Sequence, residues 1–152
     1  MIMKASKIIG LLITIVQLTG TVAMVLGMYT MVSVFSTAIP QGEGEIDIQI
    51  GDPVVIPFSI TPSNPGYLAA ELSVSISLVG DGDEEIVSDS AELVIPAMSQ
   101  VPVDLELSLS QALAEEYLVE GADVAWVIDM RVTTLYDLIS FSNTLTMSGG
   151  AQ

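Results

Sequence analysis

The chain has 152 residues, a formal net charge of −16, and neither cysteine nor histidine. Its three Lys and Arg residues cannot form the clustered basic surface that nucleic-acid binding requires. Without cysteine there are no disulfides, thiolate metal sites or cysteine nucleophiles. Without histidine the commonest general base is missing. We therefore expect a protein without catalytic residues and without a cofactor.

The N-terminal part carries a long uncharged stretch, Ile8 to Gly42. A helix needs about 20 apolar residues to cross the hydrocarbon layer of a membrane, and this stretch is longer. The apolar core of a secretory signal is shorter, about 7–15 residues. The sequence predicts an uncleaved transmembrane helix and stalk over residues 8–37. Cleavage near Ser36-Thr37-Ala38 stays open as the alternative.

The basic residues predict the orientation of this helix. Lys4 and Lys7 precede it, and the next basic residue is Arg131. Positive residues near a span end favour the cytoplasmic side. We expect residues 1–7 to be cytoplasmic and the rest of the chain beyond the helix to lie outside the cell membrane.

The helix also carries small residues at a regular spacing. Thr19, Ala23 and Gly27 follow one another at i,i+4 positions, the arrangement that lets two membrane helices approach closely. They are candidates for helix packing, either in self-association or within a membrane complex.

The remainder predicts a single all-β domain over residues 46–147, after a linker at 38–45 and before a tail at 148–152. Apolar and polar residues alternate with the period of two that is typical of half-buried strands, and clusters of Gly, Pro and Asn separate the runs. We expect strands at 45–50, 54–60, 72–78, 86–95, 101–109, 124–132 and 139–147, with loops at 61–66 and 96–100.

Seven such strands indicate an antiparallel β-sandwich of the immunoglobulin-like class, with a closed barrel as the alternative. Ser110 followed by Gln111 to Glu116 predicts a short, N-capped helical insertion, which Gly121 would end.

The loop between the third and fourth strands is rich in carboxylates. Oxygen ligands suit a hard cation such as calcium, but the spacing does not match the twelve-residue calcium loop, and a solvated tip that protects the strand edges is the alternative. The weak candidates for a metal site are Asp81, Asp83, Glu84 and Glu85.

Two other side chains of the β domain stand out. Trp126 is the only tryptophan and is expected to anchor the core. Arg131 is the domain's only base and is expected to pair with Asp129 or with a carboxylate on a neighbouring strand.

The charge is distributed unevenly along the chain. All nineteen acidic residues lie at or after Glu43, against Arg131 as the one base there, which gives the outer part a formal charge of −18. Such a surface repels anionic lipid headgroups and favours basic or cationic partners. It equally keeps a domain soluble.

Several motifs resemble the late-embryogenesis-abundant type-2 domain, also called the water-stress and hypersensitive-response domain, which is found in archaea and plants. They are Ile56 to Thr61 running into Asn64-Pro65, Ile95-Pro96-Ala97 before a further strand, and Gly121 before Val124-Ala125-Trp126. The resemblance implies a β-sandwich with a structural or stress-related role and supplies no catalytic residues.

The layout of one N-terminal helix and an outward β-sandwich is also similar to archaeal pilins and to the stator subunits of the archaellum, although Lys4-Ala5-Ser6-Lys7 does not match a processing site. We therefore expect a membrane-anchored structural or assembly protein of the cell envelope. The alternatives are a pilin-like filament subunit and an acidic binding module for a basic partner or cations.

Overall fold

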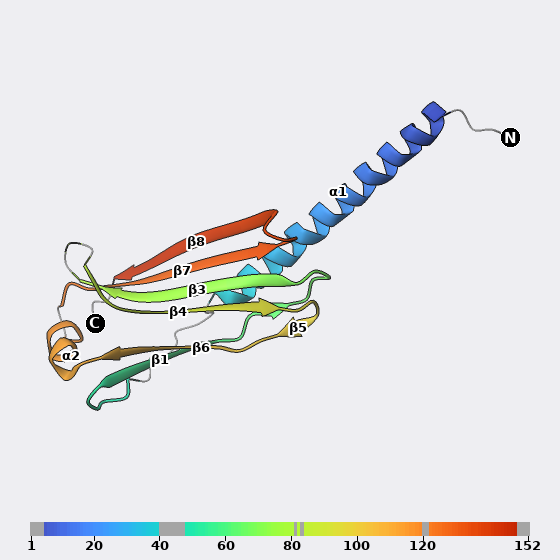
Figure 1. Ribbon diagram of the computed structural model, residues 1–152. Coiled ribbons are helices and arrows are strands. Elements are labelled where there is room, and N and C mark those ends of the chain that lie inside the picture. The colour runs from blue at the N-terminus through green and yellow to red at the C-terminus, as the bar shows by residue number, and fades with distance from the viewer. Residues whose placement is uncertain (1–4, 40–47, 81, 83, 120–121, 149–152) are drawn as a thin grey trace.

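The computed structural model describes residues 5–39, 48–80, 82, 84–119 and 122–148. A long helix, α1 (Ala5–Ala38), leaves one end of an all-β domain obliquely, and about half of it projects beyond the strands (Figure 1). The domain contains eight strands and one short helix, α2, in the described residues. The predicted combination of an N-terminal helix with an antiparallel β-sandwich is confirmed.

The six long strands lie within about two residues of predicted boundaries. In chain order the elements of the domain are β1 (Val54–Ile60), β2 (Ser63–Asn64), β3 (Ala70–Val79), β4 (Glu85–Ile95), β5 (Ser99–Gln100), β6 (Val103–Leu109), α2 (Gln111–Tyr117), β7 (Ala125–Thr134) and β8 (Ile139–Ser148).

The strands form one large sheet, one two-stranded sheet and one small two-stranded pairing. The large sheet has the order β4-β3-β7-β8, β1 pairs with β6, and β2 pairs with β5. Every pairing is antiparallel. The apolar faces of the large sheet and of the β1-β6 pair contribute to a single core cluster.

Alternation along the strands determines which side chains fill that core, because successive side chains of a strand point to opposite faces. The apolar residues expected inside β3 and β6 are all buried, while the residues between them are exposed or half-buried. These buried residues are Leu72, Val74, Ile76, Leu78, Val103, Leu105, Leu107 and Leu109.

The helical insertion also forms where it was expected. Ser110 has extended backbone angles (φ −62°, ψ 154°), and its side chain accepts a hydrogen bond from the Leu113 backbone N–H at 3.4 Å. A side-chain acceptor at this position satisfies one of the free N–H groups of the first turn. Gly121, the predicted end of the insertion, lies outside the described residues.

The two segments expected as loops at 61–66 and 96–100 each contain a two-residue strand. Ser63 pairs with Gln100 and Asn64 pairs with Ser99. Turn-forming residues break long strands, but they do not prevent a short ladder when a second segment lies alongside. The prediction of simple loops was wrong at these four residues.

The first expected strand, at 45–50, does not form in its described part. Ile48 to Ile50 contributes one isolated bridge, between Gln49 and Val55, with N···O distances of 2.9 and 3.1 Å. Ile50 is 93% exposed, so no core covers the predicted apolar face there. Alternation of apolar and polar residues gives a segment one apolar face, but a strand also needs a hydrogen-bonded partner along its length. Residues 45–47 lie outside the described residues.

Candidate functional site at the junction of helix and sandwich

The N-terminal half of α1 projects beyond the strands (Figure 1). Its large apolar side chains from Ile8 to Val22 are 45–69% exposed. Lys7–Ala38 is long and apolar enough to cross a membrane. A helix with apolar residues around its whole circumference suits a lipid environment better than water.

The C-terminal half of α1 packs against the sandwich. Its buried residues are Gly27, Thr30, Val34 and Ala38, at spacings of three or four residues that place them on one face of the helix. Val34 and Ala38 belong to the same core cluster as the strands. The helix therefore packs against the domain from Gly27 to Ala38, about a third of its length.

Two glycines set the distance between helix and sandwich. A Cβ atom on Gly27 would lie 2.7 Å from Ile139 Cδ1 and 2.9 Å from Leu135 Cδ1. A Cβ atom on Gly66 would lie 2.1 Å from Thr30 Oγ1 and 2.9 Å from its Cα. A larger residue at Gly66 would push against the Thr30 backbone and separate the two parts, whereas at Gly27 the ends of the Ile139 and Leu135 side chains would have to move aside.

The three predicted helix-packing residues therefore lie in different surroundings. Gly27 faces the turn between β7 and β8 of its own chain. Ala23 is half-buried and Thr19 is exposed. The helix face that these three residues share is exposed at Thr19 and packs against the sandwich at Gly27.

Polar and aromatic contacts complete the junction. The Thr37 hydroxyl lies 2.9 Å from both the backbone N and the carbonyl O of Ser63, and it accepts a hydrogen bond from that N–H. Phe35 meets Phe141 of β8 edge-to-face, with ring centroids 4.7 Å apart and an interplanar angle of 79°. Phe141 is still 43% exposed, because it lies on the edge strand β8 and α1 covers it only in part.

Asn64 holds the loop that carries Gly66. The Asn64 side chain is fully buried, and its amide nitrogen lies 2.8 Å from the Leu68 carbonyl, 3.0 Å from that of Ile95 and 3.1 Å from that of Pro96. Its carbonyl oxygen accepts a hydrogen bond from the Gly66 N–H at 3.0 Å. One side chain thus ties the loop after β2 to the end of β4.

Sequence reasoning placed Asn64 and Gly66 in a turn without giving either a role. The Asn-Pro-Gly order was the available signal, because Asn side chains often bond to backbone groups two residues on and Gly permits close approach. Thr30 carried no signal at all.

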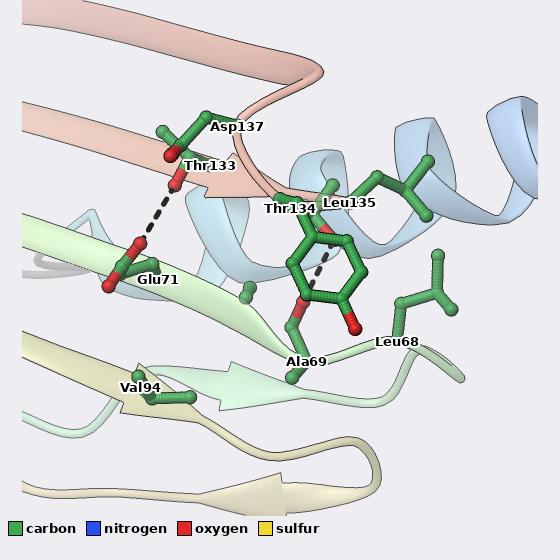
Figure 2. Close-up of a pocket in the computed structure, with 10 residues that line it drawn as sticks. Leu68, Ala69, Glu71, Val94, Thr133, Thr134, Leu135 and Asp137 are labelled. Atoms are coloured by element: carbon green, nitrogen blue, oxygen red, sulfur yellow. Dashed lines mark hydrogen bonds between the residues drawn. The ribbon is translucent and has the colours of Figure 1, made fainter.

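A cavity of about 370 Å³ lies beside this junction, between the ends of β3, β4 and β7. Figure 2 shows the Glu71 carboxylate and the Thr133 hydroxyl pointing toward each other, at 3.5 Å, with Asp137 next to Thr133. The Thr134 hydroxyl donates to the Ala69 carbonyl at 2.8 Å. The lining residues are Leu68, Ala69, Ala70, Glu71, Val94, Thr133, Thr134, Leu135, Tyr136 and Asp137.

Trp126 lies at the other end of the domain. It is half-buried, packs against the core, and lines a second hollow of about 400 Å³ together with Phe58, Tyr117 and Met147. The Glu116 carboxylate raises the pKa of the Tyr117 phenol above its ordinary value, with smaller contributions from burial and from Glu84.

The acidic residues proposed for a metal site are only partly described. Glu85 opens β4 and accepts a hydrogen bond from the Ser88 hydroxyl at 2.7 Å. Glu84 is exposed, and Asp81 and Asp83 lie outside the described residues. Within the described ranges, no three potential ligands of the His, Cys, Asp or Glu type converge on one point.

Arg131 lies on the outer face of the large sheet, in a hollow that Glu71, Glu92 and Asp137 also line. Asp129, its expected partner on the same strand, accepts a hydrogen bond from the Thr144 hydroxyl of β8.

Comparison with known proteins gives structural likeness only. No family profile and no curated protein matches the sequence. A beta-glucuronidase of Bacteroides uniformis matches with a TM-score of 0.46 and 7% identity, over 66% of this chain and 12% of that one. A putative beta-galactosidase of Bacteroides fragilis matches with a TM-score of 0.45 and 8% identity, over 64% of this chain and 14% of that one. A protein from Archaeoglobus fulgidus matches with a TM-score of 0.38 and 9% identity, over 69% of this chain and 92% of that one. Scores this low support no inference about function.

Proposed function

We propose that this chain is a single-pass membrane protein whose N-terminal helix anchors an acidic β-sandwich outside the cytoplasm, with a structural or assembly role in the cell envelope and no catalysis. The observation that carries the proposal is the junction itself. The last third of α1 packs into the core of the sandwich, while the residues from Lys7 to Val22 are exposed and largely apolar. Because Gly27 to Ala38 packs against the sandwich (the head), this segment is no flexible hinge, and a force on the head is transmitted to the membrane helix.

The charge distribution supports the proposed orientation. Lys4 precedes α1 and Lys7 lies in its first turn, and both would hold the N-terminus in the cytoplasm. The carboxylates follow the helix and have little influence on orientation. The carboxylates that face solvent would surround the head with negative charge on the outer side.

Two surfaces favour assembly as the role. The outer edge of β8 is unpaired in the described structure, and this strand carries Ser and Thr in place of charged residues from Ile139 to Ser148. An edge strand exposes free N–H and C=O groups that can pair with another chain. Thr19 and Ala23 leave part of the small-residue face of α1 open to a second helix. A filament subunit of the pilin type, a stator-like subunit and a structural sandwich of the late-embryogenesis-abundant type would all use such contacts.

Topology can be tested by labelling, because the chain has no native cysteine. Single-cysteine variants Ser90→Cys, at an exposed position of β4, and Ser6→Cys, at the N-terminal end of α1, would be expressed in intact cells and treated with a membrane-impermeant maleimide. We expect Ser90→Cys to react in intact cells and Ser6→Cys to react only after lysis. The reverse pattern would overturn the orientation, and recovery of both variants in the soluble fraction would overturn the anchor.

Assembly can be separated from charge-driven binding by ionic strength. The detergent-extracted protein would be compared in low and high salt by light scattering and electron microscopy. We expect assemblies that persist in high salt, since apolar helix contacts and strand pairing are screened little. Dissociation in high salt would favour the alternative, an acidic module that binds a basic partner or cations, because screening weakens contacts between exposed charges.

A further inference from the structure

The end of the sandwich nearest α1 carries a group of exposed apolar and aromatic side chains, here called the apolar tip: Tyr67, Met98, Tyr136 and Leu138. They are 64%, 62%, 99% and 82% exposed, respectively. They come from three loops that follow β2, β4 and β7. Such large exposed side chains gathered at one end of a small domain mark an interaction surface.

These loops lie directly beside the helix. The Gly66 carbonyl accepts a hydrogen bond from the Met98 N–H at 3.2 Å, and Gly66 itself lies against Thr30. Leu135, next to Tyr136, lies against Gly27. Loops that carry the apolar tip therefore meet α1 at Gly27 and Thr30, at the end of the sandwich from which the helix projects (Figure 1).

Charge is sparse in the loops at this end of the domain, although Glu71 lines the neighbouring cavity. The loops 61–69 and 96–102 contain no charged residue, and the loop 135–138 contains only Asp137. The opposite end carries five acidic residues, Asp52, Glu84, Glu115, Glu116 and Asp123, beside the exposed Ile50 and Val119. A net negative domain that met a membrane by its acidic end would be repelled by anionic headgroups, whereas the apolar tip is not.

The backbone of the tip is held in an uncommon conformation. Met98, Leu135, Tyr136 and Asp137 have φ between 54° and 63°, and they are the non-glycine residues with positive φ in the described structure. Such residues cost free energy, and they occur where the surroundings hold a functional conformation. In this case the conformation presents Tyr136 and Leu138 to the outside.

The length of the helix agrees with the position of the tip. From Lys7 to Leu26 there are about 20 residues, and at about 1.5 Å per residue they span roughly the 30 Å of the hydrocarbon layer. The outer boundary of that layer then falls at Gly27 to Thr30, level with the tip. Tyr29, which is 50% exposed, lies at the same level, and Tyr side chains favour the headgroup zone.

We propose that the apolar tip inserts into the outer boundary between headgroups and hydrocarbon of the bilayer that α1 spans, so that the sandwich is seated on the membrane with its acidic end pointing away. This inference rests on the proposed membrane anchor. Seating of the tip, together with the packed junction, would hold the head in one orientation relative to the membrane plane.

The test uses tryptophan fluorescence, since Trp126 is the only tryptophan and lies at the opposite end of β7. The full chain would be reconstituted in two sets of phosphatidylcholine vesicles whose acyl chains carry bromine, a contact quencher, either close to the headgroups, to report on the tip probe, or close to the bilayer centre, to report on the membrane probe. The Trp126→Phe background would carry either Tyr136→Trp as the tip probe or Leu18→Trp as the membrane probe. The native chain supplies the far-end control, and Val119→Trp in the same background is a matched exposed position at that end.

We expect loss of tryptophan emission for Tyr136→Trp and Leu18→Trp, and unchanged emission for the native chain and for Val119→Trp. Quenching of Leu18→Trp without quenching of Tyr136→Trp would overturn the seating and leave the anchor intact. An unquenched Leu18→Trp would overturn the anchor and the seating together. Should Trp126→Phe prevent folding, Tyr136→Cys labelled with an environment-sensitive dye in the otherwise native chain decides by the same criterion.

Discussion

Gly66 lies so close to Thr30 that a Cβ atom on the glycine would fall 2.1 Å from the threonine hydroxyl oxygen. This contact joins a loop of the sandwich to the middle of the apolar helix, and Asn64 holds the loop in place from the other side. The position of the head relative to its anchor therefore depends on a few small or buried residues.

Gly66→Ala should loosen the junction. The added methyl group would also meet the Thr30 Cα at 2.9 Å, and backbone cannot move aside cheaply, so we expect a loss of about 1–3 kcal/mol in unfolding free energy. Denaturant unfolding in detergent measures the loss. Gly20→Ala is the matched control, because nothing lies within 4 Å of its Cβ position. Equal effects of the two substitutions would contradict the close approach.

Thr30→Val should stabilise the protein. The Thr30 side-chain oxygen is buried and has no hydrogen-bond partner among the described residues, and Val keeps the shape while removing the unsatisfied group. A gain of about 1 kcal/mol is expected. Thr21→Val is the control, since the exposed Thr21 hydroxyl donates to the Gln17 carbonyl at 2.9 Å. A destabilised Thr30→Val would show that the hydroxyl has a partner.

Asn64→Ala should destabilise the sandwich by about 3 kcal/mol, because its removal leaves several buried backbone groups unpaired. The thermal midpoint followed by circular dichroism provides the measurement. Asn143→Ala, at a half-buried position on the edge strand β8, should change stability by less than about 1 kcal/mol. Similar losses at the two positions would argue against a special role of Asn64.

The Phe35–Phe141 contact should appear as an energetic coupling. In a double-mutant cycle with Ala at both positions, we expect a coupling of about 0.5–1.5 kcal/mol beyond the loss of buried area. The same cycle for Phe35 and Phe58, which lie on α1 and on β1, serves as the control and should give no coupling. A coupling near zero for the first pair would mean that α1 is not docked as described.

Asp137→Gly should stabilise the tip loop. Asp137 has φ 63°, a conformation that costs an L-residue roughly 1 kcal/mol and glycine very little. Asp123→Gly is the control, because Asp123 is not among the residues with positive φ, and its substitution should be neutral or destabilising. Chemical denaturation of both variants decides, and a destabilised Asp137→Gly would show that the carboxylate matters more than the backbone.

The sequence by itself determined the local structure. The uncharged run from Ile8 predicted one helix, the period of two predicted the main strands, and Ser110 predicted the cap of α2. These signals are readable because a helix satisfies its own backbone, and because a buried strand face imposes its period on neighbouring residues.

Only the tertiary structure decided at which residue α1 stops being exposed and starts to pack against the sandwich. Gly27 was expected to face another helix, and it contacts Leu135 and Ile139, more than a hundred residues later in the chain. The pairing of β2 with β5 and the partial cover of Phe141 were also absent from the predictions. Each depends on which distant segments meet, and local periodicity specifies a face to be covered without specifying what covers it.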